Sequence, residues 1–176
     1  MPIDPLPWLE YRWSFDFPAA MLPAIVTRLG GTSARLEETL RGAPEAIRQR
    51  PASGGWSVQE QAGHLLSVEA LWQVRLDEYL AGATTLTAAD MSNRHTDAAD
   101  WNQRPLAEML AAFRSVRTSF TARLAALTLE DAARTAHHPR LNRPMRLVDL
   151  CFFAAEHDDH HLAMLAKRLD ELRSGS

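Results

Sequence analysis

The sequence lacks several features that mark large classes of proteins. It has a single cysteine, Cys151, so no disulfide can form within the chain, and a lone thiol is typical of a reducing compartment. The formal net charge is −3 and no block of five like charges occurs, which argues against a basic surface that binds nucleic acid. No stretch approaches 18 apolar residues, so we expect no membrane-spanning helix.

The N-terminal residues also lack the pattern of a secretory signal peptide. MPIDPLPWLEYRWSFDFP has no basic region followed by an apolar run. We therefore predict a cytoplasmic protein with neither a nucleic acid nor a membrane as its partner. Residues 1–17 hold three prolines, two tryptophans and two phenylalanines. We expect an extended arm there, whose aromatic side chains cover either the mouth of a site or a partner chain.

The length and the apolar pattern indicate a single helical domain over residues 1–176. A chain of this length can bury a core without disulfides or metal ions, so a metal, if bound, need not hold the fold. Apolar residues recur at helical spacing in most of the chain, and no segment predicts a convincing strand. The economical architecture is an all-α, antiparallel four-helix bundle.

Local signals give the expected limits of the helices. Ser57 and Glu60 have the spacing of a capping box, so a helix should begin at Val58. Gly30 and Gly31 are expected to interrupt the first helical segment. The helices are expected at residues 18–29, 32–40, 58–80, 105–127 and 147–172, and long loops at 83–103 and 128–146.

Histidines are concentrated on the last predicted helix, in the stretch AEHDDHHLAM. His157 and His161 lie four residues apart on its inward, apolar stripe, so their rings can converge on one point. This is the spacing by which two imidazoles bind one metal ion from a helix. The candidate third ligand is His64, on the inward face of the 58–80 helix. Three neutral imidazoles with open positions suit Zn²⁺, Ni²⁺ or Fe²⁺.

Simpler interpretations stay open for each of these residues. A histidine on an apolar face is commonly a hydrogen-bonded core residue, and the HExxH motif of zinc proteases is absent. Glu60 is a candidate acid or base, or only part of the capping box. Asp158 is a candidate partner of a ligand imidazole, or only a solvated charge. We expect the loop histidines His137 and His138 at the surface, with an approach to a site mouth as the alternative.

Two motifs resemble one known family. GGWSVQEQAGHLLSVEALW, residues 54–72, is similar to the WS-x-x-E-x-x-x-HL-x-x-x-E signature of the DinB/YfiT-like superfamily. AEHDDHHLAMLAKRL, residues 155–169, resembles that family's last helix with its H-x-x-x-H. RPLAEMLAAFRSVR and LNRPMRLVDLCFFAAEHDDHH are similar to one branch of it. The resemblance covers most of the chain, from about Leu22 to Leu169.

The resemblance implies a fold, a site and a range of activities. The fold is a four-helix bundle with up-down-down-up connectivity, and members often form homodimers. The site is a divalent metal ion held by three histidines, here His64, His157 and His161. Some members are thiol-dependent S-transferases or isomerases that use bacillithiol or mycothiol, and others are classed as metal-dependent hydrolases. One departure is Ser67, where members often have aspartate, whereas Glu69 is kept.

The sequence therefore supports more than one function. The first hypothesis is a metal-dependent enzyme, a thiol-dependent S-transferase or a hydrolase, that acts on a small-molecule substrate with a low-molecular-weight thiol as a candidate cosubstrate. The alternative is a non-catalytic, stress-associated binding or metal-sensing bundle. A third hypothesis is a metal-free bundle with a buried histidine cluster.

Overall fold

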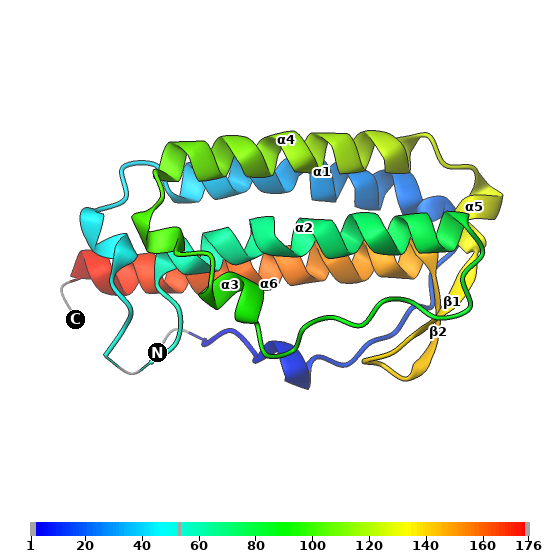
Figure 1. The fold of residues 1–176 in the computed structure, drawn as a ribbon, viewed down its shortest axis with the longest axis horizontal. Coiled ribbons are helices and arrows are strands. Elements are labelled where there is room, and N and C mark those ends of the chain that lie inside the picture. Colours follow the sequence, from blue (N-terminus) through cyan, green and yellow to red (C-terminus); the bar gives the residue numbers. More distant parts are fainter. Residues whose placement is uncertain (1–2, 53, 175–176) are drawn as a thin grey trace.

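The structure is a computed structural model that describes residues 3–52 and 54–174. Its body consists of four long helices, which lie side by side in a bundle (Figure 1). Helices α1 and α6 run in one direction and α2 and α4 in the other, so the predicted up-down-down-up bundle is confirmed. Consecutive helices α1 and α2 are diagonal, and each packs against both α4 and α6. The bounds are α1 Leu22–Thr39, α2 Val58–Leu80, α4 Leu106–Ala125 and α6 Leu147–Ser174.

The start of α2 follows the predicted capping box. The backbone N–H of Glu60 donates to Ser57 Oγ at 3.0 Å, and the Ser57 N–H donates to Glu60 Oε2 at 2.8 Å. These two bonds satisfy N–H groups that a helix terminus otherwise leaves without partners. Both residues are buried, so the first turn of α2 is fixed close to the histidine that follows one turn later.

The predicted break in the first helix is wrong. Gly30 and Gly31 lie inside one continuous helix, α1. A glycine in a helix interior costs up to about 1 kcal/mol relative to alanine, but burial of apolar side chains on one face can outweigh that cost. Leu29 and Leu36, on either side of the glycine pair, are both fully buried. Packing against α4 and α6 therefore keeps the helix intact.

The prediction of a strandless chain is also wrong. Two short strands, β1 (Thr135–His138) and β2 (Arg143–Arg146), form an antiparallel hairpin between α5 (Leu129–Ala133) and α6. An isolated parallel bridge between Thr85 and His137 attaches the long 83–103 segment to this hairpin. That segment then runs back along the bundle and includes α3 (Arg94–Asp97) (Figure 1). Short 3₁₀ helices span Trp8–Glu10, Ala19–Met21, Glu45–Arg48 and Trp101–Gln103.

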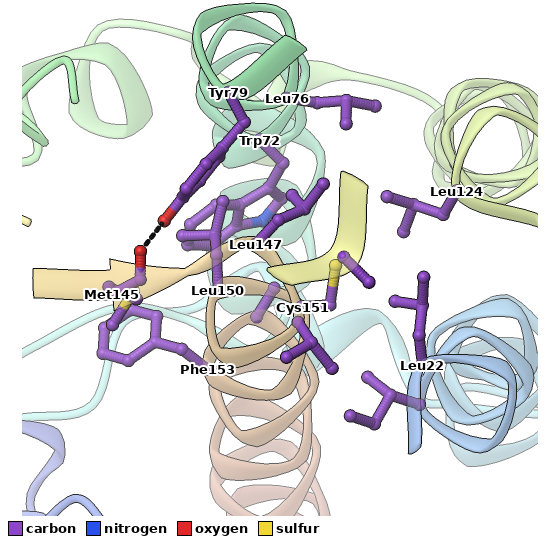
Figure 2. Packing of buried hydrophobic residues seen from close by; sticks show 14 of the residues in the cluster. Leu22, Trp72, Leu76, Tyr79, Leu124, Met145, Leu147, Leu150, Cys151 and Phe153 are labelled. Carbon is purple, nitrogen blue, oxygen red and sulfur yellow. Dashed lines mark hydrogen bonds between the residues drawn. The ribbon is translucent and has the colours of Figure 1, made fainter. Parts of the chain in front are cut away.

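One apolar cluster, which includes Leu36, Leu65 and Phe113, fills the end of the bundle away from the hairpin, and a second fills the bundle near the hairpin end. Figure 2 shows side chains of α1, α2, α4, the hairpin and α6 packed together there, with the Tyr79 hydroxyl donating to the Met145 carbonyl at 2.8 Å. Cys151 is part of this cluster, and burial raises the pKa of its thiol to about 12. None of the helices in the described ranges combines the length and apolarity needed to cross a membrane.

An ionic cluster is buried where the four helices meet. The Arg117 guanidinium of α4 pairs with both Glu69 of α2 and Asp158 of α6, and all three side chains are at most 3% exposed. The hydroxyl of Thr32 on α1 donates to Asp158 at 2.8 Å. Arg117 also donates to the Leu29 carbonyl at 3.1 Å. This cluster links all four helices, since each contributes at least one group to it.

Candidate metal centre

Three imidazoles from two helices converge inside the bundle. His64 of α2 and His157 and His161 of α6 are all buried at 7% exposure. Nε2 of His157 lies 3.3 Å from Nε2 of His64 and 3.2 Å from Nε2 of His161. One ligand atom from each histidine lies within 4.8 Å of the other two. The structure thus brings the three predicted ligands together, and we refer to them as the histidine triad.

Two neighbouring side chains orient the triad. Gln61 Oε1 lies 2.7 Å from His161 Nδ1, so this nitrogen donates and Nε2 carries the lone pair. The Thr96 hydroxyl of α3 lies 2.9 Å from His64 Nδ1 and can accept from it in the same way. Trp56 packs over His64 with ring centroids 4.7 Å apart, and its Nε1 donates to Asp97 of α3 at 2.9 Å. The long 83–103 segment thereby supplies a support that the sequence did not predict.

Burial keeps the triad in its neutral form. It lowers the pKa of His64 to about 4, with a smaller contribution from His160. It lowers the pKa values of His157 and His161 well below the ordinary range, and the neighbouring imidazoles add to this effect. A metal ion binds imidazole only in its neutral form, so the site has the required protonation state at neutral pH.

The geometry of the triad fits a tetrahedral divalent ion. Nitrogens bound at about 2.0–2.1 Å to such an ion lie about 3.3 Å apart, which matches the two Nε2 distances. The buried Nδ1 of His157 has no hydrogen-bond partner within the described residues. A proton on Nε2 of His157 could satisfy only one of its two neighbours, whereas a cation between the three nitrogens satisfies all of them. The residues present therefore fit a metal ion.

The triad opens onto a cavity of about 660 Å³. Its walls are mainly aromatic and aliphatic, and they include Trp8, Trp56, Trp72 and Phe153. Trp8 comes from the arm, which runs along the same side of the bundle as the 83–103 segment (Figure 1). Its ring lies 5.2 Å from that of His157 and 5.0 Å from that of Phe153. The arm and the long segment therefore enclose the space next to the triad.

Glu60, the candidate acid or base, and Asp158, the candidate partner of a ligand imidazole, do not line this cavity. Glu60 completes the capping box and accepts from the Arg50 guanidinium at 2.7 to 3.0 Å. Asp158 is wholly buried and paired with Arg117, so the interpretation as a solvated charge is wrong. Asp159, which flanks the triad, pairs at the surface with Arg28 and Arg35 of α1. The structure thus places Glu60 in a helix cap with a neighbouring loop ion pair, and Asp158 and Asp159 in ion pairs between helices.

Several further polar residues line the cavity. His138 is 1% exposed, so the expectation of a surface position is wrong for this residue, and the alternative, an approach to a site, holds for it. It lines the cavity together with Arg75 and Arg140. His95 and His160 line it as well, and His160 lies 3.5 Å from the Tyr11 hydroxyl of the arm. The residues HHPR around His138 stood out in the sequence, but only the hairpin shows that this side chain points inward.

Fold and site together define a four-helix bundle with an inward-facing histidine triad. The family model of the DinB superfamily matches residues 28–165, which includes all three histidines. The chain belongs to the DinB superfamily.

A solved structure supports the fold independently. YfiT from Bacillus subtilis, described as a probable metal-dependent hydrolase with an unusual four-helix bundle topology, superposes with a TM-score of 0.80. The two sequences are 21% identical, and the match covers 94% of each chain. At this identity the likeness establishes the shared fold. The comparison with curated proteins gives no match.

Proposed function

We propose that this protein is a metal-dependent enzyme that acts on a small molecule in the cavity beside the triad. The observation that carries the proposal is the convergence of three neutral Nε2 atoms at the wall of a largely apolar cavity. A structural metal site normally closes its coordination shell with four protein ligands. Three histidines leave an open position, and the cavity gives a substrate access to it.

The residues around the triad have separate roles in this proposal. A divalent ion, when bound, supplies a Lewis acid that lowers the pKa of a water or thiol at the open position. Gln61 and Thr96 hold His161 and His64 in the tautomer that presents Nε2. Trp8, Trp56 and Trp72 exclude bulk water and offer flat apolar surface to the substrate. None of these roles requires Glu60 or Asp158.

Hydrolysis and thiol transfer are the two reaction classes that we propose for this site. In the first, a water attacks an ester or amide bond; in the second, a low-molecular-weight thiol attacks an electrophile. Buried Cys151 is not this thiol, because burial strongly disfavours its thiolate. Zn²⁺, Ni²⁺ and Fe²⁺ are the ions that suit three imidazoles. A homodimer and a cytoplasmic location remain predictions.

The open position can be tested by spectroscopy and turnover together. We would load the metal-free protein with Co²⁺ and record visible absorption before and after addition of azide or a small thiol. We expect the spectrum to change with either additive, and the Zn²⁺-loaded or Ni²⁺-loaded protein to turn over a member of an ester, amide or thiol–electrophile panel. An unchanged spectrum without turnover would contradict the enzyme and favour the non-catalytic metal-binding alternative.

A further inference from the structure

The wall of the cavity away from the triad carries two cationic side chains without acidic partners. Arg75 of α2 is 1% exposed, and its Nε and Nη2 donate to the Thr87 carbonyl at 3.0 and 2.8 Å. Arg140, in the hairpin turn, is half-buried, donates to the Trp8 carbonyl at 3.5 Å, and packs over the Trp8 ring at 5.3 Å and the Phe153 ring at 5.6 Å. Within residues 3–52 and 54–174, neither guanidinium forms an ion pair with a carboxylate. A buried charge is costly unless something compensates it.

His138 adds an unsatisfied donor to this wall. The Leu141 N–H donates to its Nδ1 at 3.2 Å, while Nη1 of Arg75 lies 3.1 Å from its Nε2. A neutral imidazole carries a proton on one ring nitrogen and accepts only at the other. In one of these two contacts, therefore, the N–H of His138 faces another N–H group. An oxygen acceptor placed beside Arg75 and His138 would relieve that conflict. The site therefore lacks a negatively charged or strongly accepting group.

The rest of the cavity supplies no such acceptor. Among the described lining residues the only carboxylate is Asp90, which is exposed. It accepts from the side chain and backbone of Ser92 at 2.5 and 3.0 Å and from the Arg94 backbone at 3.1 Å. These contacts engage Asp90 within its own loop. Water can supply the acceptor in the ligand-free cavity, and the anionic group of a ligand would supply it together with the compensating charge.

Aromatic rings connect the basic wall to the triad. The Trp8 ring contacts Arg140 on one side and His157 on the other, with the His157 ring 5.2 Å away. Trp72 makes the same link on α2, with the Arg75 guanidinium 5.7 Å and the His157 ring 5.9 Å from its ring. One aromatic side chain thus separates each guanidinium from His157. A small molecule with an apolar body can span that distance.

We infer that the cavity binds the anion of an organic acid. Its carboxylate group lies at Arg75, His138 and Arg140. Its apolar body lies along Trp8 and Trp72 toward the triad. A planar carboxylate matches guanidinium donors better than a neutral acceptor does. Two N–H groups of Arg75 are already engaged with Thr87, and the largely apolar walls favour an anion with an apolar body over inorganic phosphate. The inference that such an acid is the substrate rests on the proposed function. The inference that the cavity binds such an acid does not.

The inference is tested by binding of simple probes to the full chain. Calorimetric titrations would compare benzoate and phenylacetate with the neutral benzamide and phenylacetamide, and with inorganic phosphate. We expect each acid to bind about ten-fold more tightly than its amide, because charge-assisted hydrogen bonds are the stronger ones. Arg140→Met should remove about that advantage, and Arg140→Lys should restore part of it.

Arg143→Met is the matched control. Arg143 also packs over an aromatic ring, that of Phe15 at 5.1 Å, and donates to a backbone carbonyl of the arm at 3.4 Å, but it does not line the cavity. The Arg143→Met variant should therefore keep the preference for the acid over the amide. Equal binding of acid and amide, or an acid preference that survives Arg140→Met, would overturn the inference. Phosphate binding as tight as benzoate binding would overturn the carboxylate assignment.

Parallel titrations separate this inference from the proposed function. They would use chelator-treated and Zn²⁺-loaded protein, and His157→Ala, with metal content measured on every sample. If protein without metal still prefers the acid, and the preference depends on Arg140, the anion site is upheld. That result stands even where the proposed enzymatic function fails its own test. Loss of acid binding in His157→Ala but not in Arg140→Met would place the anion at the metal and overturn the inference.

Discussion

At the scale of single residues, the triad depends on side chains that are not ligands. The Nδ1 atoms of His64 and His161 have hydrogen-bond partners in Thr96 and Gln61, whereas the buried Nδ1 of His157 has none among the residues that the structure describes. A partner at Nδ1 fixes the ring orientation and increases the basicity of Nε2. Ser67, where the family resemblance implied aspartate, donates its hydroxyl to the Gly63 carbonyl at 3.1 Å. Support for His64 thus comes from the 83–103 segment instead.

Removal of the Thr96 hydroxyl should weaken metal binding without loss of the fold. Thr96→Val keeps the shape of the side chain but leaves His64 Nδ1 without an acceptor. We expect the dissociation constant for Zn²⁺ to rise about 10- to 100-fold, measured by competition with a chromogenic chelator. Thr121→Val is the control, because its hydroxyl bonds only to carbonyls of its own helix. Equal affinities of the two variants would contradict the role given to Thr96.

His138 should make stability depend on pH. Burial lowers its pKa to about 4, and the nearby Arg75 and Arg140 add to the shift. Between pH 6.5 and 4 the unfolded chain therefore binds a proton that the folded protein does not, so stability decreases as the pH falls through this window. For metal-free protein, His138→Gln should remove up to about 1.4 kcal/mol per pH unit of this dependence. Urea unfolding of the wild type and of His138→Gln at pH 7 and pH 5 measures this dependence. The same change in unfolding free energy between the two pH values for both proteins would refute the prediction.

At the scale of elements, α2 must approach the 3₁₀ helix Trp101–Gln103 very closely. A Cβ atom added to Gly63, the residue before His64, would lie 2.3 Å from the Trp101 ring. Trp101 is itself buried, at 6% exposure. Gln59 of α2 fixes the same contact, since its Nε2 donates to the carbonyls of Trp101 and Arg104 at 2.6 and 2.8 Å. The glycine is required here by packing, not by its own backbone conformation.

Gly63→Ala should therefore destabilise the protein, by about 1–3 kcal/mol for the overpacked site. Gly31→Ala is the matched control. Gly31 also lies inside a helix, but an added Cβ would meet nothing within 4 Å, so the better helix propensity of alanine should stabilise by about 0.5–1 kcal/mol. Chemical denaturation gives both values. If the Gly63→Ala variant were as stable as Gly31→Ala, the Trp101 ring would move aside without loss of stability, which would contradict the prediction.

The sequence predicted the elements that depend on local patterns and missed those that depend on packing. The capping box at Ser57 and the i, i+4 pair of His157 and His161 are local, and both have the expected geometry. The continuity of α1 and the hairpin were missed for physical reasons. Buried contacts outweigh the glycine cost in α1, and the four-residue strands are too short to show an alternating pattern. Thr96 and Arg140 reach the cavity through tertiary contacts of loop and turn segments.

At the scale of the whole molecule, the buried ionic cluster joins the four helices beneath the triad. Asp158 of this cluster directly follows His157 in α6, so the cluster also restrains that ligand. Glu69 and Asp158 share the single cation Arg117. Removal of one member of such a buried pair leaves charge without compensation, which is far more costly than loss of a surface pair.

Arg117→Met should accordingly cost about 3–5 kcal/mol of unfolding free energy. Arg114→Met on the same helix is the control, because its ion pair with Glu37 is exposed and should contribute far less. Denaturant titrations of both variants measure the difference. Comparable losses for the two would mean that the cluster does not stabilise the bundle more than a surface pair does.

The most direct test of the account is the metal content of the purified, untagged chain, measured by elemental mass spectrometry. His64→Ala, His157→Ala and His161→Ala would be compared with His160→Ala, which changes an imidazole that lines the same cavity outside the triad. We predict one divalent ion per chain in the wild type and in His160→Ala, and close to none in each triad variant. Wild-type protein without metal after incubation with Zn²⁺ and Ni²⁺, or triad variants that keep their metal, would contradict it.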